Sequence, residues 1–279
     1  MITCARPSAA LRDLVRYYYQ VESRLANSAA VQPVPARSPE AIEFTFGTPY
    51  EVHRLDRGGV ENAHPIALIG VQTFRRVELV MRGHVDAFTI VFQPGGVFRL
   101  FGIPGEVLAN DHFDGGAALG RGLGELLRRL GSKTSFADRV VIADDSLRAR
   151  CTTLEPASSV ARAAMKVLAH DGCGRMLDLA CSTGLGVRQF ERLFRREVGM
   201  PPKLYARIVR FEAALRHKAA SPARRWTDVA HVLGYHDQMH MVHDFNQLSG
   251  GSPTAVGSQL DMFVQPEVVS WRPRGQSQP

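Results

Sequence analysis

The sequence contains few cysteines, and none of them forms a closely spaced pair. Cys4, Cys151, Cys173 and Cys181 are spread over 279 residues without a CxxC motif. A structural zinc site or a disulfide framework would need tighter or paired spacing. The four thiols therefore predict a protein that stays reduced in the cytoplasm. Cys181 falls inside a short helical pattern, and we expect it to be buried rather than reactive.

Long apolar runs are absent as well. No stretch reaches the roughly 18 apolar residues that a membrane-spanning helix needs. The N-terminus lacks the basic and then apolar pattern of a signal peptide. We therefore expect a cytoplasmic protein with no membrane partner.

The motifs that cradle nucleotide phosphates are also missing, since neither GxGxxG nor GxxxxGKS/T occurs. A metal-dependent enzyme would have to use His53, His64, His84 and Glu43 in the first half, where no HxH pair exists. Glu43 lies in an apolar strand pattern, which is more typical of a buried hydrogen-bonding residue or an edge charge. We expect no cofactor, no metal and no enzymatic activity, with this metal site as the alternative.

Positive charge is concentrated in one segment of the chain. The formal net charge is +7, from 34 Lys+Arg and 27 Asp+Glu. Residues 157–260 hold 14 Lys+Arg and 8 Asp+Glu, whereas residues 1–156 hold 18 and 17. This localisation is what a nucleic-acid-binding surface requires.

Hydrophobic periodicity divides the chain into two parts. An amphipathic helix is predicted from Leu11 to Tyr18, followed by short apolar runs separated by turn residues. The runs that predict strands are Ala41–Phe46, Ile66–Val71, Val77–Met81 and Ala87–Phe92. We therefore predict a small β-rich barrel or sandwich over residues 1–133.

Helical periodicity begins at about residue 120, with a leucine stripe that ends at Gly131. Residues 134–156 are predicted to form a linker or helical connection, and residues 157–260 an all-helical domain. The tail, residues 261–279, is rich in Pro, Gly, Ser and Gln and is predicted to be flexible.

The second half contains an internal repeat. The first copy spans Leu177–Tyr205 and the second Thr227–Val256. Ala180 and Gly184 recur 50 residues later as Ala230 and Gly234; Phe190, Phe194, Gly199 and Pro202 recur 51 residues later as Met241, Phe245, Gly250 and Pro253. Six positions at such constant spacing indicate one supersecondary unit used twice.

Each copy has the layout of a helix-turn-helix. A small residue, Ala180 or Ala230, lets a second helix approach, and a glycine four residues later ends the first helix. The second helix begins at Gly186 in the first copy and at Asp237, a strong N-cap, in the second. A long helix from about Pro202 to Ala219 would join the two units, with a packing stripe and a cationic side of Arg207, Arg210 and Arg216.

This arrangement resembles the AraC/XylS family of bacterial transcription regulators, over about Val160–Leu260. The segment GYHDQMHMVHDF is close to the family's signature around its second recognition helix. The phrases EAIEFTFGTP, LIGVQT and FTIVFQPGGVFRLFGIP resemble the β-rich sensor region of some members. The resemblance implies an α+β multidomain protein, in which a cupin-like effector-binding or dimerisation domain precedes an all-α domain of two helix-turn-helix units joined by a long helix.

The resemblance further implies sequence-specific binding of double-stranded DNA at two successive major-groove segments. Output would pass through contact with RNA polymerase, as in an activator, or through promoter occlusion. A small effector or homodimer formation through the first domain would modulate it. Expected base contacts are Arg188, Gln189, Glu191, Arg192, Gln238, Met239, His240 and His243, and expected phosphate contacts are Arg195, Arg196 and Lys203.

The second recognition helix departs from the family pattern. His243 stands where an arginine is frequent, and Asp244 is expected to place a negative charge near the phosphates. The first unit lacks a hydroxyl N-cap at Gly186, and Val256 replaces Tyr205 of the first copy. We expect the first unit to supply most of the affinity, because a neutral histidine brings little Coulomb attraction.

Three alternatives remain. A zinc site would use His236, His240 and His243, which share one helical side, but no HExxH carboxylate accompanies them. A DNA-binding accessory factor without transcriptional output would use the same helices. A repair methyltransferase would need a reactive cysteine in a recognisable motif, which Cys151 and Cys181 lack.

Overall fold

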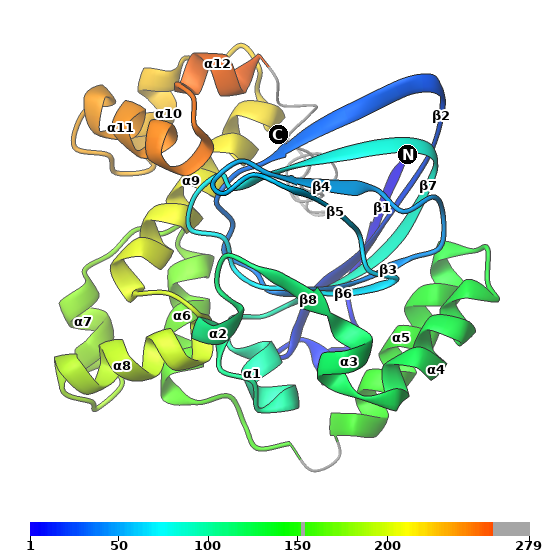
Figure 1. Cartoon of the computed structure of the whole chain (residues 1–279). Helices are drawn as coiled ribbons and strands as arrows, with labels where there is room; N and C mark the ends of the chain where they lie inside the picture. The colour runs from blue at the N-terminus through cyan, green and yellow to red at the C-terminus, as the bar shows by residue number, and fades with distance from the viewer. Residues whose placement is uncertain (152–153, 259–279) are drawn as a thin grey trace, which may run out of the picture.

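A β-rich region comes first and an all-helical region follows it (Figure 1). The computed structural model describes residues 1–151 and 154–258, so the predicted tail at 261–279 lies outside the described residues. The strands are β1 (Ile2–Ala5), β2 (Val15–Val34), β3 (Ala41–Thr45), β4 (Glu51–Arg54), β5 (Val60–Asn62), β6 (Ile66–Ile69), β7 (Val77–Phe92) and β8 (His112–Asp114).

Helices follow and flank the strands. They are a short 3-10 helix η1 (Ala9–Leu11), α1 (Gly96–Phe101), α2 (Gly105–Leu108), α3 (Gly115–Leu119), α4 (Arg121–Gly131), α5 (Phe136–Cys151), α6 (Ser159–Ala169), α7 (Met176–Cys181), α8 (Val187–Val198), α9 (Pro202–Ala220), α10 (Trp226–Val232), α11 (Gln238–Ser249) and α12 (Pro253–Gly257). No helix within residues 1–151 and 154–258 is long and apolar enough to cross a membrane.

Two long antiparallel strands, β2 and β7, form the spine of the sheet. They pair from Val15↔Phe92 to Val34↔Val77, with irregularities between Val15 and Tyr17 and between Leu25 and Ala30. The sheet runs in the order β1-β2-β7-β3-β6-β8, and β4 joins it by pairing with both β5 and β7. The strands curve around one another like a partly closed barrel (Figure 1).

Two sequence predictions are wrong in this region. The helix predicted over Leu11–Tyr18 is a 3-10 turn followed by the start of β2, and its apolar residues all face the core. The β-branched and aromatic run from Val15 to Tyr19 favours a strand over a helix. The two runs Val77–Met81 and Ala87–Phe92 belong to one strand, because the polar residues between them continue to pair with β2, as in Leu25↔Gly83.

The sheet has two different faces, as the alternation of side chains along a strand requires. Large residues such as Ile42, Phe44 and Phe88 are buried on one face, together with leucines of α4 and α5. The other face carries two alanines, Ala41 and Ala67, beside Ile69 and Val91. The helices α4 and α5 therefore cover the bulky face, and the small residues leave space on the opposite one.

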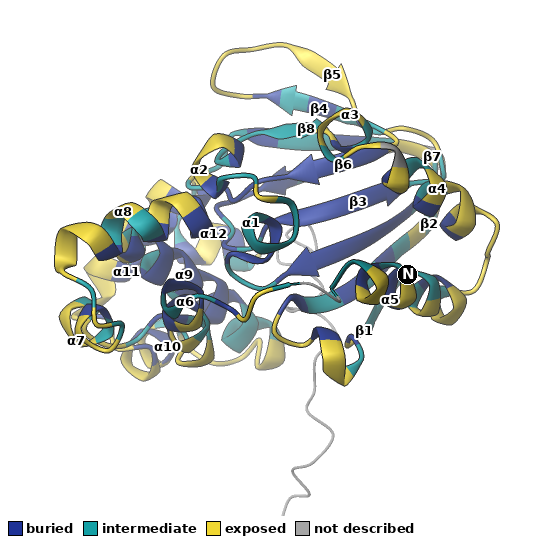
Figure 2. Ribbon diagram, turned by 90° about the horizontal axis from the view of Figure 1, so that it is seen from below, coloured by how far each residue is buried: buried dark blue, intermediate teal, exposed yellow. Residues whose placement is uncertain are grey.

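Strands β3 and β6 are buried along their length, whereas β5 is exposed (Figure 2). Helix α5 occupies most of the segment predicted as a linker or helical connection. Ala143 and Leu147 of α5 lie in the core of the β-rich region, so α5 packs with the first region. The boundaries of the domains stay predictions.

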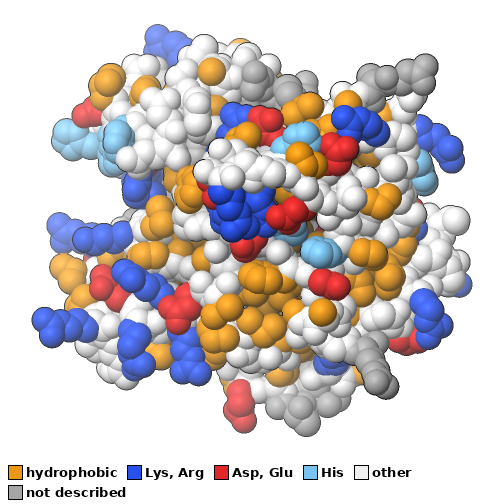
Figure 3. All heavy atoms as spheres, viewed as in Figure 1, with side chains coloured by type: hydrophobic (Ala, Val, Ile, Leu, Met, Phe, Trp, Pro, Cys, Tyr) orange, Lys and Arg blue, Asp and Glu red, His pale blue; other side chains and the backbone are white. Residues whose placement is uncertain are grey.

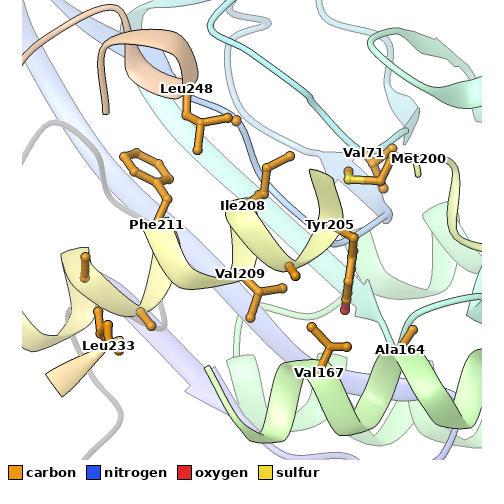
Figure 4. Close-up of a cluster of buried hydrophobic side chains, with 14 of the residues drawn as sticks. Val71, Ala164, Val167, Met200, Tyr205, Ile208, Val209, Phe211, Leu233 and Leu248 are labelled. Carbon is orange, nitrogen blue, oxygen red and sulfur yellow. The ribbon is translucent and has the colours of Figure 1, made fainter. Parts of the chain in front are cut away.

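The second region is all-helical, from α6 to α12. Helix α9 runs through its centre, and Tyr205, Ile208 and Phe211 are fully buried along it (Figure 4). The core is continuous across both repeats, because Phe194 of α8 and Phe245 of α11 belong to the same cluster. The predicted architecture, a β-rich region followed by two helix-turn-helix units on a long helix, is confirmed.

Candidate nucleic-acid interface and effector cavity

The first helix-turn-helix consists of α7 and α8. Gly184 lies in the turn with φ of 71°, in the left-handed region that glycine adopts without strain. Helix α8 starts after Gly186, whose backbone is extended and which has no side chain to cap the helix. Phe190 and Phe194 anchor the inner face of α8, with ring centroids 5.5 Å apart in an edge-to-face arrangement.

The opposite face of α8 is exposed and cationic. The exposed side chains among the predicted contacts are Arg188, Gln189, Arg192, Arg195 and Arg196, with Lys203 exposed at the start of α9. Glu191 is half-buried. Arg196 packs its guanidinium over the ring of Phe98 in α1, 5.2 Å from the centroid, so this arginine lies at the edge of the face, against the β-rich region.

The second helix-turn-helix consists of α10 and α11. Gly234 has φ of 65° in the turn, and Asp237 caps α11 by accepting a hydrogen bond from the His240 amide at 2.7 Å. The same amide is the main cause that holds the pKa of Asp237 below its usual value. The predicted N-cap is confirmed. Its negative carboxylate also interacts favourably with the positive end of the helix dipole.

The outer face of α11 is exposed and largely neutral. Gln238, Met239, His240 and His243 are all exposed. His240 packs edge-on against Tyr235, and His243 lies 3.1 Å from the amide nitrogen of Gln247. In the space-filling view, Lys and Arg side chains gather over α7 and α8 and histidines over α10 and α11 (Figure 3). The part of the chain that is described contains no group of three or more His, Cys, Asp or Glu residues placed to hold a metal ion.

Asp244 does not lie on the outer face of α11, which corrects the expectation of a negative charge near the phosphates. Its side chain is buried and accepts hydrogen bonds from Arg207 of α9, the shorter at 2.7 Å. The prediction of a cationic side on α9 is also wrong, because its arginines pair with groups inside the protein. Arg210 donates to the Gly172 carbonyl and Arg216 to the Asp171 carboxylate, so these arginines hold the helices together.

The β-rich region encloses a cavity of about 420 Å³ on the small-residue face of its sheet. Alanines of β3, β6 and β7 and apolar side chains of β2 and β4 line it. The volume falls within the range of roughly 300–1,000 Å³ that is typical of small-molecule sites.

Polar groups gather along one part of the cavity wall. Glu43 accepts hydrogen bonds from the Tyr50 hydroxyl and, at 3.2 Å, from the Thr89 hydroxyl. Burial, and after it the neighbouring Glu43 carboxylate, raise the pKa of Tyr19 to about 12, while the hydrogen bond with Thr89 and the charge of Arg37 oppose the shift. Glu43 is therefore the buried hydrogen-bonding residue that its strand pattern predicts.

Arg37 and Gln72 form a second polar part of the wall. Both side chains line the cavity. Within residues 1–151 and 154–258, neither Nε of Arg37 nor Oε1 of Gln72 has a hydrogen-bond partner, although both atoms are buried. Unsatisfied buried polar atoms are costly, by about 1–3 kcal/mol each, so this end of the cavity favours a polar ligand group.

The family comparison agrees with the geometry of the helices. The model described as "Helix-turn-helix domain" matches residues 179–259, which contain both recognition helices. The C-terminal region thus carries a helix-turn-helix domain of the AraC type. A domain of this type supports DNA binding and transcription regulation as the function of the chain. A second model, "Domain of unknown function (DUF6597)", matches residues 4–114 of the β-rich region.

Solved structures of ToxT from Vibrio cholerae share the fold of this chain. One ToxT structure has a TM-score of 0.50 at 8% identity, covering 88% of this chain and 98% of ToxT. A second, bound to (E)-4-(8-methylnaphthalen-1-yl)but-3-enoic acid, has the same score and identity and covers 88% and 99%. A comparison with curated protein sequences finds no match.

The sequence analysis did not identify Arg37 and Gln72 as residues of the cavity wall. The local signal for Arg37 was the run PVPARSPE, in which an arginine stands among prolines that keep the chain extended. Cys181 is exposed, contrary to the expectation of burial, because it lies on the outer side of the short helix α7 while Ala180 faces inward.

Proposed function

We propose that α8 and α11 enter two successive major-groove segments of one DNA duplex and read base edges there. The observation that carries this proposal is that both helices bury one face in a shared core and, apart from the half-buried Glu191, expose their predicted contact residues on the other. A recognition helix needs this division between a fixed inner face and an accessible outer face. Helix α9 supplies the rigid connection between the two units.

The two recognition helices would contribute unequally. On α8, Arg188, Arg192 and Arg195 recur at intervals of four and three, so they share one side of the helix. Bidentate arginine contacts to guanine are the commonest specific contacts in the major groove. The exposed residues of α11 include no Lys, Arg, Asp or Glu side chain. We infer that α8 supplies most of the affinity and α11 mainly sequence discrimination.

A selection from a random duplex library with the full chain tests this function. Repeated enrichment of one motif, with two half-sites spaced by about one helical turn, is expected. The selected duplex should remain bound in excess competitor DNA at two salt concentrations. Enrichment of no motif, with binding that falls steeply with salt, would favour the alternative of a non-specific DNA-binding accessory factor.

Replacement of Arg192 by alanine is expected to weaken binding of the selected duplex by about 1–3 kcal/mol, or roughly 5- to 150-fold. Fluorescence anisotropy measures this loss. The matched control is Arg128→Ala on α4, whose side chain is 75% exposed, far from the helix-turn-helix units in the chain. Equal affinity of the Arg192 variant and the wild type at moderate salt would remove Arg192 from the interface.

We further propose that the cavity binds an elongated apolar molecule with an anionic head group at Arg37. The wall is apolar over most of its surface, and Arg37 and Gln72 supply the buried polar atoms that need partners. ToxT, which shares the fold, has been solved with an arylbutenoic acid, a molecule of this chemistry. A carboxylate would accept hydrogen bonds from the guanidinium of Arg37.

Replacement of Arg37 by leucine is expected to weaken binding of (E)-4-(8-methylnaphthalen-1-yl)but-3-enoic acid about 10- to 150-fold, because hydrogen bonds to charged groups contribute about 1.5–3 kcal/mol. Isothermal titration calorimetry measures the affinity. The corresponding alcohol, which carries no charge, serves as a control ligand and should bind both proteins with similar affinity. If wild-type protein binds acid and alcohol equally, the cavity does not select an anionic head group.

A further inference from the structure

The connection between β2 and β3 presents alternate residues to two different partners. Pro35, Arg37 and Pro39 line the cavity. Ala36 and Ser38, between them, are buried on the other side of the segment, toward the helical region. An extended chain directs successive side chains to opposite faces, so this segment is both a cavity wall and a contact surface.

The contact surface holds the linking helix and the second recognition helix. The Ser38 amide donates to one carboxylate oxygen of Glu212 and the Ser38 hydroxyl to the other, both at 2.7 Å. Glu212 lies in the middle of α9 and is buried. The Ala36 amide donates to the Leu248 carbonyl in the last turn of α11, also at 2.7 Å.

A second segment, the one that follows β6, completes the same surface. The Arg37 amide donates to the Gln72 carbonyl at 2.8 Å and the Gln72 amide to the Arg37 carbonyl at 3.0 Å. Val71, next to Gln72, packs into the helical core beside Met200 (Figure 4). A side chain on Gly199, the C-cap of α8, would come within 2.8 Å of Val71, so the two regions meet without a gap.

Ala36 and Val71 are thus members of the core that is otherwise built from the helical region. Each is the immediate neighbour of a residue whose side chain ends in the cavity with a buried atom that has no partner in the described chain. A ligand group that satisfies those atoms would act on backbone that also anchors α9 and α11.

We propose that the two-stranded bridge of residues 36–38 and 71–72 couples the cavity to the DNA-binding helices. This inference rests on the proposed function, because it concerns how an occupant of the cavity regulates DNA binding. Ser38 and Glu212 are positioning residues in it, since they touch neither ligand nor DNA. A close-packed junction of this kind transmits a change at one face to the other, and the coupling is reciprocal.

A double-mutant cycle in the full chain without ligand tests the coupling. Gln72→Leu alters the cavity side of the bridge, and Ser38→Ala removes a contact to α9. Hydrogen exchange of the α9 amides is followed by mass spectrometry on peptides within residues 202–220. Gln72→Leu is expected to accelerate this exchange about twofold to tenfold in the wild-type background and to have almost no effect in the Ser38→Ala background.

Two matched controls lie elsewhere in the β-rich region. Gln93→Leu and Ser132→Ala remove the same side-chain types at positions that do not line the cavity. Each is expected to leave the exchange of α9 unchanged, alone and in combination with the other. If the effects of Gln72→Leu and Ser38→Ala simply multiply, or if Gln72→Leu leaves α9 unchanged in the wild type, the bridge does not couple the two regions.

The same peptides report on a bound ligand. In the wild type and in the Ser38→Ala protein, saturating arylbutenoic acid should slow the exchange of residues 36–38 and 70–72. It should slow the exchange of α9 in the wild type alone. Equal slowing of α9 in the Ser38→Ala protein would overturn the coupling. Failure of the acid to slow any segment would contradict the proposed ligand class, whereas the ligand-free cycle would still decide the coupling.

Discussion

Replacement of Phe194 by alanine is expected to lower the free energy of unfolding by about 3–5 kcal/mol and to abolish DNA binding at 37 °C. Phe194 is fully buried, and its ring lies 5.5 Å from the rings of both Phe190 and Tyr205 in edge-to-face contacts. It therefore joins α8 to α9. Truncation would leave a cavity that these helices cannot fill without losing other contacts, because native cores are already close-packed.

Urea unfolding followed by far-UV circular dichroism measures the loss. Phe74→Ala is the matched control, because that phenylalanine is 40% exposed and its removal should change stability by about 0.5 kcal/mol or less. Arg192→Ala separates folding from recognition, since it should weaken DNA binding at almost unchanged stability. A Phe194→Ala protein within 1 kcal/mol of the wild type would show that α8 is not held by this residue.

The helical region could be predicted in detail because its signals are local and occur twice. Gly184 and Gly234 lie in the turn after the first helix of each unit, and both take the left-handed conformation that their positions require. Asp237 caps α11 as its residue type and position indicate. Each of these features depends on a few neighbouring residues, so one sequence is enough to identify it.

The β-rich region could be predicted only as a class, because strand pairing depends on residues far apart in the chain. Residues 82–84 read as a polar break, yet they pair with β2 residues about 60 positions earlier, as in Arg24↔His84. The cavity depends on the same non-local pairing. Ala41, Ala67 and Ala87 come together on one face only after three separate strands align.

Helical spacing did contain a signal for the buried polar residues. Asp244 lies three residues after Met241 and four before Leu248, which places it on the buried side of α11. The charge of Asp244 suggested a position on the protein surface, whereas the helical periodicity correctly indicated the buried side of α11. Its partner Arg207 on α9 could not be identified from spacing, because the two helices meet only through the tertiary fold.

The stability of the chain is expected to fall between about pH 4.5 and pH 8 through the ionisation of Glu40. Burial raises the pKa of this carboxyl to about 8, and the Val97 backbone opposes the shift only in part. Below pH 4.5 the folded and unfolded states are both protonated at this group. Between the two pH values the folded state keeps a proton that the unfolded state has released, so rising pH favours unfolding, by about 3–5 kcal/mol in total.

Glu40→Gln places a neutral group of the same shape between the β-rich region and α8. The substitution should remove the part of the pH dependence that comes from Glu40. Glu40 lies where α2 meets the end of α8, since a side chain on Gly105 would come within 3.0 Å of its Oε1 and 2.7 Å of the Gly199 amide. Unfolding free energies of both proteins are measured from pH 4.5 to 9 and subtracted. Contributions of opposite sign that both proteins share, such as that of the partly buried His112 with its lowered pKa, cancel in the difference. Glu106→Gln, an exposed position one residue after Gly105, is the control. Parallel curves for wild type and Glu40→Gln would mean that Glu40 is already ionised in the folded protein. If the two stabilities converge at low pH and the variant is the more stable at pH 8, the contact between the β-rich region and the first recognition helix contains a neutral Glu40 carboxyl.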